Sequence, residues 1–166
     1  FIQRGIEFAG RPGRKVWDPY LEDVPIELSM PGLFNVYNSL AALAVLKLYG
    51  ISASAAAEGF CKIQVPGRLE RTGDLKDCKI YVDYAHNAAS LRNVLKTLRE
   101  YGSGRLVVVF GCGGNRARNR RFLMGETAGK YADISVITTD NPREEDPLDI
   151  IRDIEQGIQR ADGKYC

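Results

Sequence analysis

The sequence lacks the features that mark several large classes of protein. No apolar run approaches the roughly 20 residues that a membrane-spanning helix needs, and the first residues do not have the layout of a secretory signal peptide. There is one histidine, and the four cysteines form no CxxC pair, so no metal-site pattern is present. We therefore expect reduced thiols, a cytoplasmic location and no metal site built from these residues.

The sequence also has little excess of one sign of charge over the other. The 23 basic and 21 acidic residues leave a net charge of +2, which is too small to attract nucleic acid or a membrane surface by charge alone. With 45% hydrophobic and 27% charged residues, the composition of the 166-residue chain is that of a globular protein able to bury a core. We expect no nucleic-acid or membrane partner.

The first part of the chain, residues 1–66, mixes short strand patterns with two helical patterns. The predicted elements are strands at residues 5–9 and 24–28 and helices at residues 34–49 and 53–61. Ser52 is placed to cap the second helix. Pro66 then breaks the pattern, and we place a domain boundary there.

After this boundary, strands alternate with helices. The predicted strands cover residues 69–75, 79–83, 105–110 and 134–138, and the predicted helices cover residues 88–101, 122–131 and 148–160. This alternation predicts an α/β fold: a Rossmann-like, mostly parallel sheet with helices on both faces. Residues 164–166 read as the opening of a further strand, so we expect an incomplete sheet in a piece of a longer protein.

Three polar, turn-rich loops follow predicted strands of the second part, at the edge where open α/β sheets collect their ligands. The first runs Asp83-Tyr84-Ala85-His86-Asn87. Its carboxylate fits contacts to a ribose or to a magnesium-phosphate group, and the loop fits a capped helix start equally well. His86, the single histidine, is more typical of a structural hydrogen bond than of a general base.

The second loop, residues 111–116, contains glycines that let the backbone approach a ligand. Its spacing is not GxGxxG, which argues against a nicotinamide-dependent oxidoreductase. The arginines that follow are suited to carboxylate or phosphate, although such runs are as often solvated surface. They are Arg116, Arg118, Arg120 and Arg121.

The third loop is Asp140-Asn141-Pro142-Arg143, which alone would be a turn before the last helix. Paired with Arg116, its amide and guanidinium groups could clamp a zwitterionic amino acid. Another pair of amides, Asn35 and Asn38, is spaced to lie on one side of a helix start. These two side chains fit either helix capping or hydrogen bonds to a nucleobase.

Five motifs together resemble the Mur ligase family, and within it the tripeptide-synthetase branch, MurE. In order they are PGLFNVYNSLAA at residues 31–42, PGRLE at 66–70, DYAH at 83–86, FGCGG at 110–114 and DNPR at 140–143. The resemblance implies a protein with a UDP-binding domain, a P-loop ATPase domain and a Rossmann-like C-terminal domain. This chain would hold the end of the second (1–66) and part of the third (67–166).

The resemblance further implies an ATP-dependent ligase of peptidoglycan synthesis. It would add meso-diaminopimelate to UDP-MurNAc-L-Ala-D-Glu as a monomer, with Mg²⁺ and most of the ATP bound outside this chain. No catalytic nucleophile is expected here, and the isolated fragment should be inactive. The implied ATP-binding residues are Asn35, Asn38, Arg68, Asp83, Tyr84 and His86. The implied amino-acid-binding residues are Arg116, Asp140, Asn141, Pro142 and Arg143.

The sequence departs from the family pattern at two of these loops. Asn115 and Ala117 replace the acidic residues of the common Gly-Gly-Asp-Arg-Asp motif, and Asn87-Ala88-Ala89 stands in place of Thr-Pro-Asp. These changes allow a MurE-like paralogue with a different substrate. Two further alternatives are a folylpolyglutamate-synthase-like ligase with another amino acid, which would share the architecture, and a non-catalytic binding module.

Overall fold

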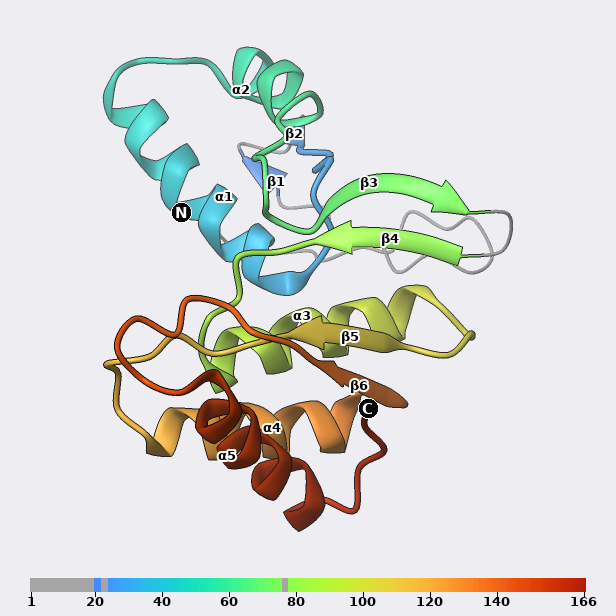
Figure 1. Ribbon diagram of the computed structural model, residues 1–166. Coiled ribbons are helices and arrows are strands. Elements are labelled where there is room, and N and C mark those ends of the chain that lie inside the picture. The colour runs from blue at the N-terminus through green and yellow to red at the C-terminus, as the bar shows by residue number, and fades with distance from the viewer. Residues whose placement is uncertain (1–19, 22–23, 76–77) are drawn as a thin grey trace. The chain divides into compact units, whose positions relative to one another are not determined.

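The computed structural model describes residues 20–21, 24–75 and 78–166 (Figure 1). It divides into two compact units, Phe1–Tyr84 and Ala85–Cys166, and each is described by itself. The strand expected at residues 5–9 lies outside the described residues. The domain boundary that we place at Pro66 stays a prediction.

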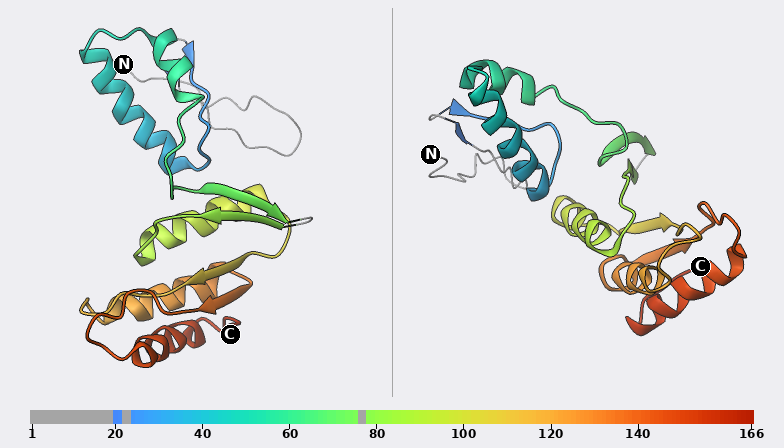
Figure 2. Two further views of the ribbon diagram at one scale, coloured as in Figure 1. Left: turned by 45° about the horizontal axis from the view of Figure 1, so that its top comes forward. Right: turned by 90° about the vertical axis from the view of Figure 1, so that its left-hand side faces the viewer.

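Two helices and a short strand segment of the first unit enclose a small apolar core (Figure 2). Helices α1 (Leu33–Leu48) and α2 (Ala53–Phe60) confirm the two predicted helices, and the Ser52 side chain caps α2 by accepting the Ala55 N–H at 3.3 Å. The buried core residues are Ile26, Leu43, Ala53, Ala56 and Phe60.

The strand expected at residues 24–28 is shorter than predicted. Strand β2 (Val24–Pro25) pairs antiparallel with β1 (Tyr20–Leu21), and only two residues of each take part. Ile26, which follows β2, is fully buried without being part of a strand. The apolar pattern therefore located the strand but overestimated its length, because a single buried residue beyond the paired ones extends the same pattern.

Strands β3 (Glu70–Leu75) and β4 (Cys78–Val82) form an antiparallel hairpin with a register shift between Arg71 and Gly73. Both strands were predicted, but as members of a mostly parallel sheet, and that part of the prediction is wrong. Only residues 76–77 separate them. A link of that length closes a hairpin, whereas parallel neighbours need a crossover of a dozen or more residues.

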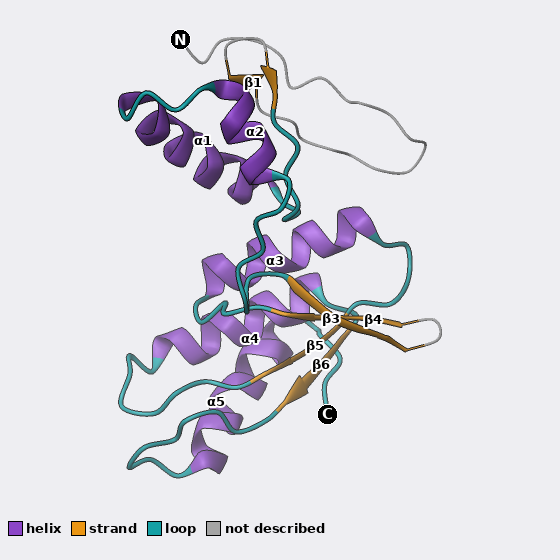
Figure 3. Ribbon diagram, turned by 90° about the horizontal axis from the view of Figure 1, so that it is seen from above, coloured by secondary structure: helices purple, strands orange, loops and turns teal. Residues whose placement is uncertain are grey.

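The second unit confirms the predicted alternation of strands and helices (Figure 3). In order, its elements are α3 (Ala88–Tyr101), β5 (Val107–Phe110), α4 (Asn119–Tyr131), β6 (Ile134–Ile137) and α5 (Pro147–Arg160). Strands β5 and β6 are parallel. Tyr165 forms a parallel bridge with Ser135 of β6, so a further strand does open at the predicted place.

One apolar core joins the three helices of this unit to its sheet. The buried members are Leu91, Leu95, Cys112, Met124, Ala128, Ile150, Ile154 and Ile158. Val108 and Phe110 of β5 pack against this core, whereas Val107 and Val109, on the opposite side of the strand, are 50% and 63% exposed. Among the described residues, helices therefore cover one face of the β5–β6 sheet, where the sequence predicted both.

Helices α4 and α5 approach each other unusually closely. A Cβ atom at Gly125 would lie 2.1 Å from the Ile154 carbonyl oxygen, and one at Gly157 would lie 2.2 Å from the Phe122 carbonyl oxygen. Because backbone atoms are the obstacle, side-chain rearrangement cannot make room. This packing fixes α5 against the start of α4. In the described parts of the chain, no helix combines the length and apolar character needed to cross a bilayer.

We expect Gly157→Ala to separate α4 from α5 and to destabilise the second unit by about 1–3 kcal/mol, because its methyl group has no space. Amide hydrogen exchange along both helices measures this. Gly59→Ala in α2 is the matched control, since a Cβ there meets no atom within 4 Å. Exchange in α4 and α5 that rises no more for Gly157→Ala than for Gly59→Ala would contradict the close packing.

Candidate functional site

Two loops at the carboxyl ends of β5 and β6 dock directly on each other. These are loop A, residues 111–118, and loop B, residues 138–146. The Gly114 N–H donates to the Asn141 carbonyl oxygen at 2.8 Å, and Arg143 Nη1 donates back to the Gly114 carbonyl oxygen. A Cβ atom at Gly114 would lie 1.8 Å from the Pro142 carbonyl oxygen, so only glycine permits this contact.

Each loop also holds one residue in the left-handed backbone region that favours glycine. These residues are Asn115 and Arg143, both with φ of 52°. The Asn115 N–H donates to the Glu145 carboxylate, and its side-chain amide lies 3.5 Å from Glu144 Oε2. Contacts between the loops thus support a conformation that neither loop would keep easily alone.

Four charged side chains from the two loops and from helices α4 and α5 form a compact group that we name the charge frame: Arg118, Arg121, Glu145 and Asp153. Arg121 donates through Nη2 to both Glu145 oxygens at 2.6 and 2.7 Å, and through Nη1 to Asp153 Oδ2 at 3.2 Å. Arg118 completes a bidentate pair with Asp153 at 2.8 and 2.7 Å. The side chains of Arg121 and Asp153 are 3% and 1% exposed.

Pairing within the charge frame keeps its acids ionised. Hydrogen bonds from Arg118, and further from Arg121, hold the pKa of Asp153 below its ordinary value against the opposing effect of burial. The hydrogen bond from Arg121, followed by that from the Asn115 N–H, lowers the pKa of Glu145. Two cations therefore face two anions, and the frame is neutral as a whole.

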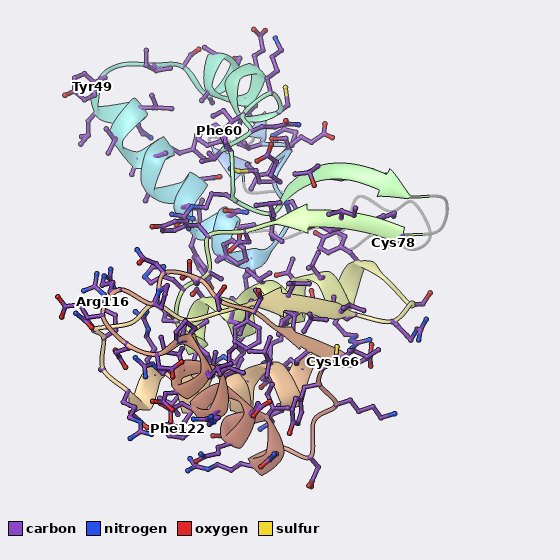
Figure 4. All side chains as sticks on the ribbon, viewed as in Figure 1. Tyr49, Phe60, Cys78, Arg116, Phe122 and Cys166 are labelled. Atoms are coloured by element: carbon purple, nitrogen blue, oxygen red, sulfur yellow. The ribbon has the colours of Figure 1, made fainter. Side chains whose placement is uncertain are left out.

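The structure divides the four arginines that the sequence grouped together. Arg118 and Arg121 are paired with carboxylates, whereas Arg116 and Arg120 have no ion pair among the described residues. Arg116 is exposed on loop A, and Figure 4 shows its side chain extending outward from that loop. Arg116 is thus the member of the run that is best placed to meet a ligand.

All of the predicted residues of the DNPR motif lie on loop B beside the glycines of loop A. Asn141 and Arg143 contact Gly114, and Asp140 lies close to Gly111, where an added Cβ would be 2.9 Å from the Asp140 nitrogen. The sequence missed Glu145 and Asp153. Glu145 lies two residues after the motif, but Asp153 is on α5, and nothing in its sequence context marks it as a partner of Arg121.

A second group of predicted residues meets at the turn between α2 and β3. One oxygen of Asp83 accepts the Leu69 N–H at 2.8 Å and holds Leu69 at a left-handed φ of 46°. The guanidinium carbon of Arg68 lies 5.1 Å above the ring centre of Tyr84, within the range of a cation–π contact. Asp83 therefore has a structural task in this turn, and it links Arg68 to the end of β4.

The remaining predicted residues lie at helix starts. Asn35 is buried and donates to the Pro31 carbonyl oxygen at 2.8 Å, while the Asn38 amide lies 3.5 Å from the Asn35 oxygen, so the two do share one side of α1. His86 is exposed. Next to it, Asn87 and Ser90 form a reciprocal cap at the start of α3, as the structural interpretation of this loop predicted.

Cys112, the one cysteine of the docked loops, is not suited to be a covalent nucleophile. Cys112 is buried against the Met124 sulfur at 3.6 Å, and burial raises the pKa of its thiol to about 11, so the reactive thiolate is not formed at neutral pH. Within the described residues, no three His, Cys, Asp or Glu side chains gather in a way that could hold a metal ion. The side chains that the two loops do present include guanidinium, carboxylate and amide groups, which are suited to hydrogen bonds and charge pairing.

Comparison with models of known protein families shows which family the chain belongs to. The family model described as "Mur ligase, glutamate ligase domain" matches residues 67–165, which include the docked loops and the charge frame. The chain belongs to the Mur ligase family. As a Mur ligase it belongs to a family of ATP-dependent enzymes that form amide bonds.

Two further comparisons identify proteins whose sequence or structure is similar to this chain. The chain is 45% identical over 140 residues to the UDP-N-acetylmuramoyl-L-alanyl-D-glutamate–2,6-diaminopimelate ligase of Caldanaerobacter subterraneus subsp. tengcongensis, covering 84% of this chain and 29% of the relative. A solved structure of a ligase with the same name is 39% identical, with a TM-score of 0.57 over 86% of this chain and 29% of the other.

A folylpolyglutamate synthase of Mycobacterium tuberculosis, solved in complex with ADP, has a TM-score of 0.67 at 25% identity, over 85% of this chain and 32% of the other. This likeness supports the α/β fold. This Mur ligase chain thus spans less than a third of the length of each of these relatives.

We expect the second unit of this Mur ligase chain to lose stability in acid. Because the pKa values of Asp153 and Glu145 are lowered on folding, the stabilisation is complete above about pH 5 and is lost as the pH falls through the folded-state values. Asp153→Asn should cost about 3 kcal/mol at pH 7, because it leaves buried Arg121 poorly compensated.

Urea unfolding at pH 7 and pH 3.5, followed by signals from α4 and α5, measures both effects. Asp149→Asn is the matched control, because Asp149 lies on the same helix and pairs with Arg152 at the surface, where both side chains are about 60% exposed. If the Asp153→Asn protein is as stable as the Asp149→Asn protein at pH 7, the charge frame does not contribute the expected free energy of unfolding.

Proposed function

We propose that this chain is the amino-acid-selecting part of an ATP-dependent ligase that adds meso-diaminopimelate to UDP-MurNAc-L-Ala-D-Glu during peptidoglycan synthesis. One observation carries the proposal. Arg116 and the DNPR motif lie on two docked loops at the ligand-binding edge of the sheet, in a chain 45% identical to a diaminopimelate ligase.

The chemistry of such a ligase needs positioning rather than a protein nucleophile. The substrate carboxylate attacks the γ-phosphorus of ATP, the bond to the bridging oxygen breaks, and ADP leaves. The amine of the incoming amino acid then attacks the carbonyl carbon of the acyl phosphate; inorganic phosphate leaves, and the nitrogen loses a proton to give the amide. In both steps, binding energy that aligns the reactants lowers the barrier.

The docked loops supply the features that recognise the amino acid. Meso-diaminopimelate carries a carboxylate beside the ammonium group at its far end, whereas lysine carries an ammonium group alone. The forked donors of Arg116 and Arg143 suit that carboxylate, and the side chains of Asn141 and Asp140 suit the ammonium group. An arginine pair facing the uncompensated ammonium group of lysine would repel it, which gives selectivity by exclusion.

The residues proposed for ATP are Asn35, Asn38, Arg68, Asp83, Tyr84 and His86. Arg68 presents a cation beside the exposed ring of Tyr84, a pair suited to phosphate and base contacts. The described residues do not provide a cluster for Mg²⁺, so we assign no step to a metal held by this chain. That the protein acts as a monomer in the cytoplasm stays our prediction.

A second candidate is a ligase for another amino acid. It rests on the structural likeness to folylpolyglutamate synthase and on Asn115 and Ala117, which remove two acidic groups beside Arg116. A more positive loop A would accept a more acidic amino acid, such as glutamate. Comparison of amino acids on the full-length protein separates the two candidates.

In the full-length protein, we expect ligation of meso-diaminopimelate with a kcat/KM at least about a hundredfold above that of lysine or glutamate. Arg116→Ala should raise the KM for diaminopimelate by about 10–100-fold, because a charge-assisted hydrogen bond is lost. Steady-state phosphate release with each amino acid measures both quantities.

Arg152→Ala is the control for this substitution, because Arg152 is an exposed arginine on α5 outside both loops. Preference for lysine or glutamate would overturn the assigned substrate. An unchanged KM for diaminopimelate in the Arg116→Ala enzyme would remove Arg116 from the binding site.

A further inference from the structure

We propose that Arg121, together with Glu145 and Asp153, is a positioning residue for amino-acid selection: it ties loop A, loop B and α5 together so that Arg116 and Arg143 reach the ligand in a fixed arrangement. This inference rests on the proposed function. It adds residues that do not touch the ligand but decide where the ligand-binding arginines lie.

Arg121 contacts both carboxylates of the charge frame, and these carboxylates lie on different segments. From the first turn of α4 it donates two hydrogen bonds to Glu145 of loop B and one to Asp153 of α5. Glu145 in turn accepts the Asn115 N–H of loop A. A single guanidinium group therefore connects the segments that bear both proposed ligand-binding arginines.

The connection lies close to those arginines along the chain. Asn115 directly precedes Arg116, and Glu145 lies two residues after Arg143. Both Asn115 and Arg143 have a left-handed φ of 52°. Asparagine tolerates this region better than most residues, so the cost falls mainly on Arg143. Loss of the Glu145 contact would release the Asn115 N–H. The backbone of loop A next to Arg116 and of loop B at Arg143 could then relax to a more ordinary conformation.

The burial of Arg121 explains why the frame can act as a rigid support. Its side chain is 3% exposed, and Asp153 is 1% exposed, so water competes little for their hydrogen bonds. The planar guanidinium group directs Nη2 to Glu145 and Nη1 to Asp153, so it sets the angle between two carboxylates, which a single ammonium group cannot do. Lysine at position 121 would keep the charge and lose this geometry.

The frame is separate from the ligand-binding charges. Its two arginines are matched by its two carboxylates, and Arg121 offers its Nη donors to Glu145 and Asp153 rather than to the exposed side of the loops. Arg116 is exposed and has no ion pair among the described residues. A change at Arg121 should therefore act on amino-acid binding through loop geometry and not through a lost ligand contact.

The test uses the full-length protein with Arg121→Lys and Glu145→Gln, which are close in size to the native residues, and Arg152→Lys on the surface of α5 as matched control. We expect the first two to raise the KM for diaminopimelate by about tenfold while the KM for ATP changes less than about twofold. Arg152→Lys should leave both values unchanged. Amide hydrogen exchange of residues 111–118 and 138–146 is measured on the same samples, below their unfolding temperatures.

Faster exchange in both loops together with a raised amino-acid KM supports the proposal. Lower thermal stability with unchanged exchange and unchanged KM would show a purely structural role and overturn it. A raised KM without faster exchange would also overturn it, since Arg121 would then act by another route. If the wild-type protein ligates no amino acid, the proposed function itself fails, and the exchange data still show whether the frame holds the loops.

Discussion

A buried pairing between one guanidinium group and two carboxylates is the interaction on which the rest of the site depends. Arg121 has to be neutralised because it is 3% exposed, and the two acids that neutralise it come from loop B and α5. The cost of leaving this charge unpaired brings distant parts of the chain together. The ion pairs that neutralise Arg121 in the folded protein therefore also hold the two loops in place.

Glycine provides the complementary requirement, which is space. Gly114 lets loop A touch the Pro142 carbonyl group of loop B, and Gly157 lets α5 lie against the start of α4, bringing Asp153 within reach of Arg118 and Arg121. Charge pairing and close backbone contact thus support each other. Either alone would leave the left-handed residues Asn115 and Arg143 without enough support.

The sequence predicted the elements of the second unit well, because periodic apolar residues and helix caps are local signals. It also found the loops that meet at the sheet edge. It missed the antiparallel pairing of β3 with β4 and the partners of Arg118 and Arg121. Asp153 lies more than 30 residues from its arginines and looks like any acidic residue on a helix surface. Burial of such a residue follows from tertiary packing, which no local pattern reports.

The most direct measurement is a double-mutant cycle between Arg121→Lys and Arg116→Ala, read as kcat/KM for diaminopimelate in the full-length protein. If Arg121 acts by placing Arg116, its substitution should lose most of its effect once Arg116 is absent, with a coupling of at least about 1 kcal/mol. Independent, additive losses would mean that Arg121 and Arg116 serve different purposes, and would contradict the account in which the buried frame sets the amino-acid site.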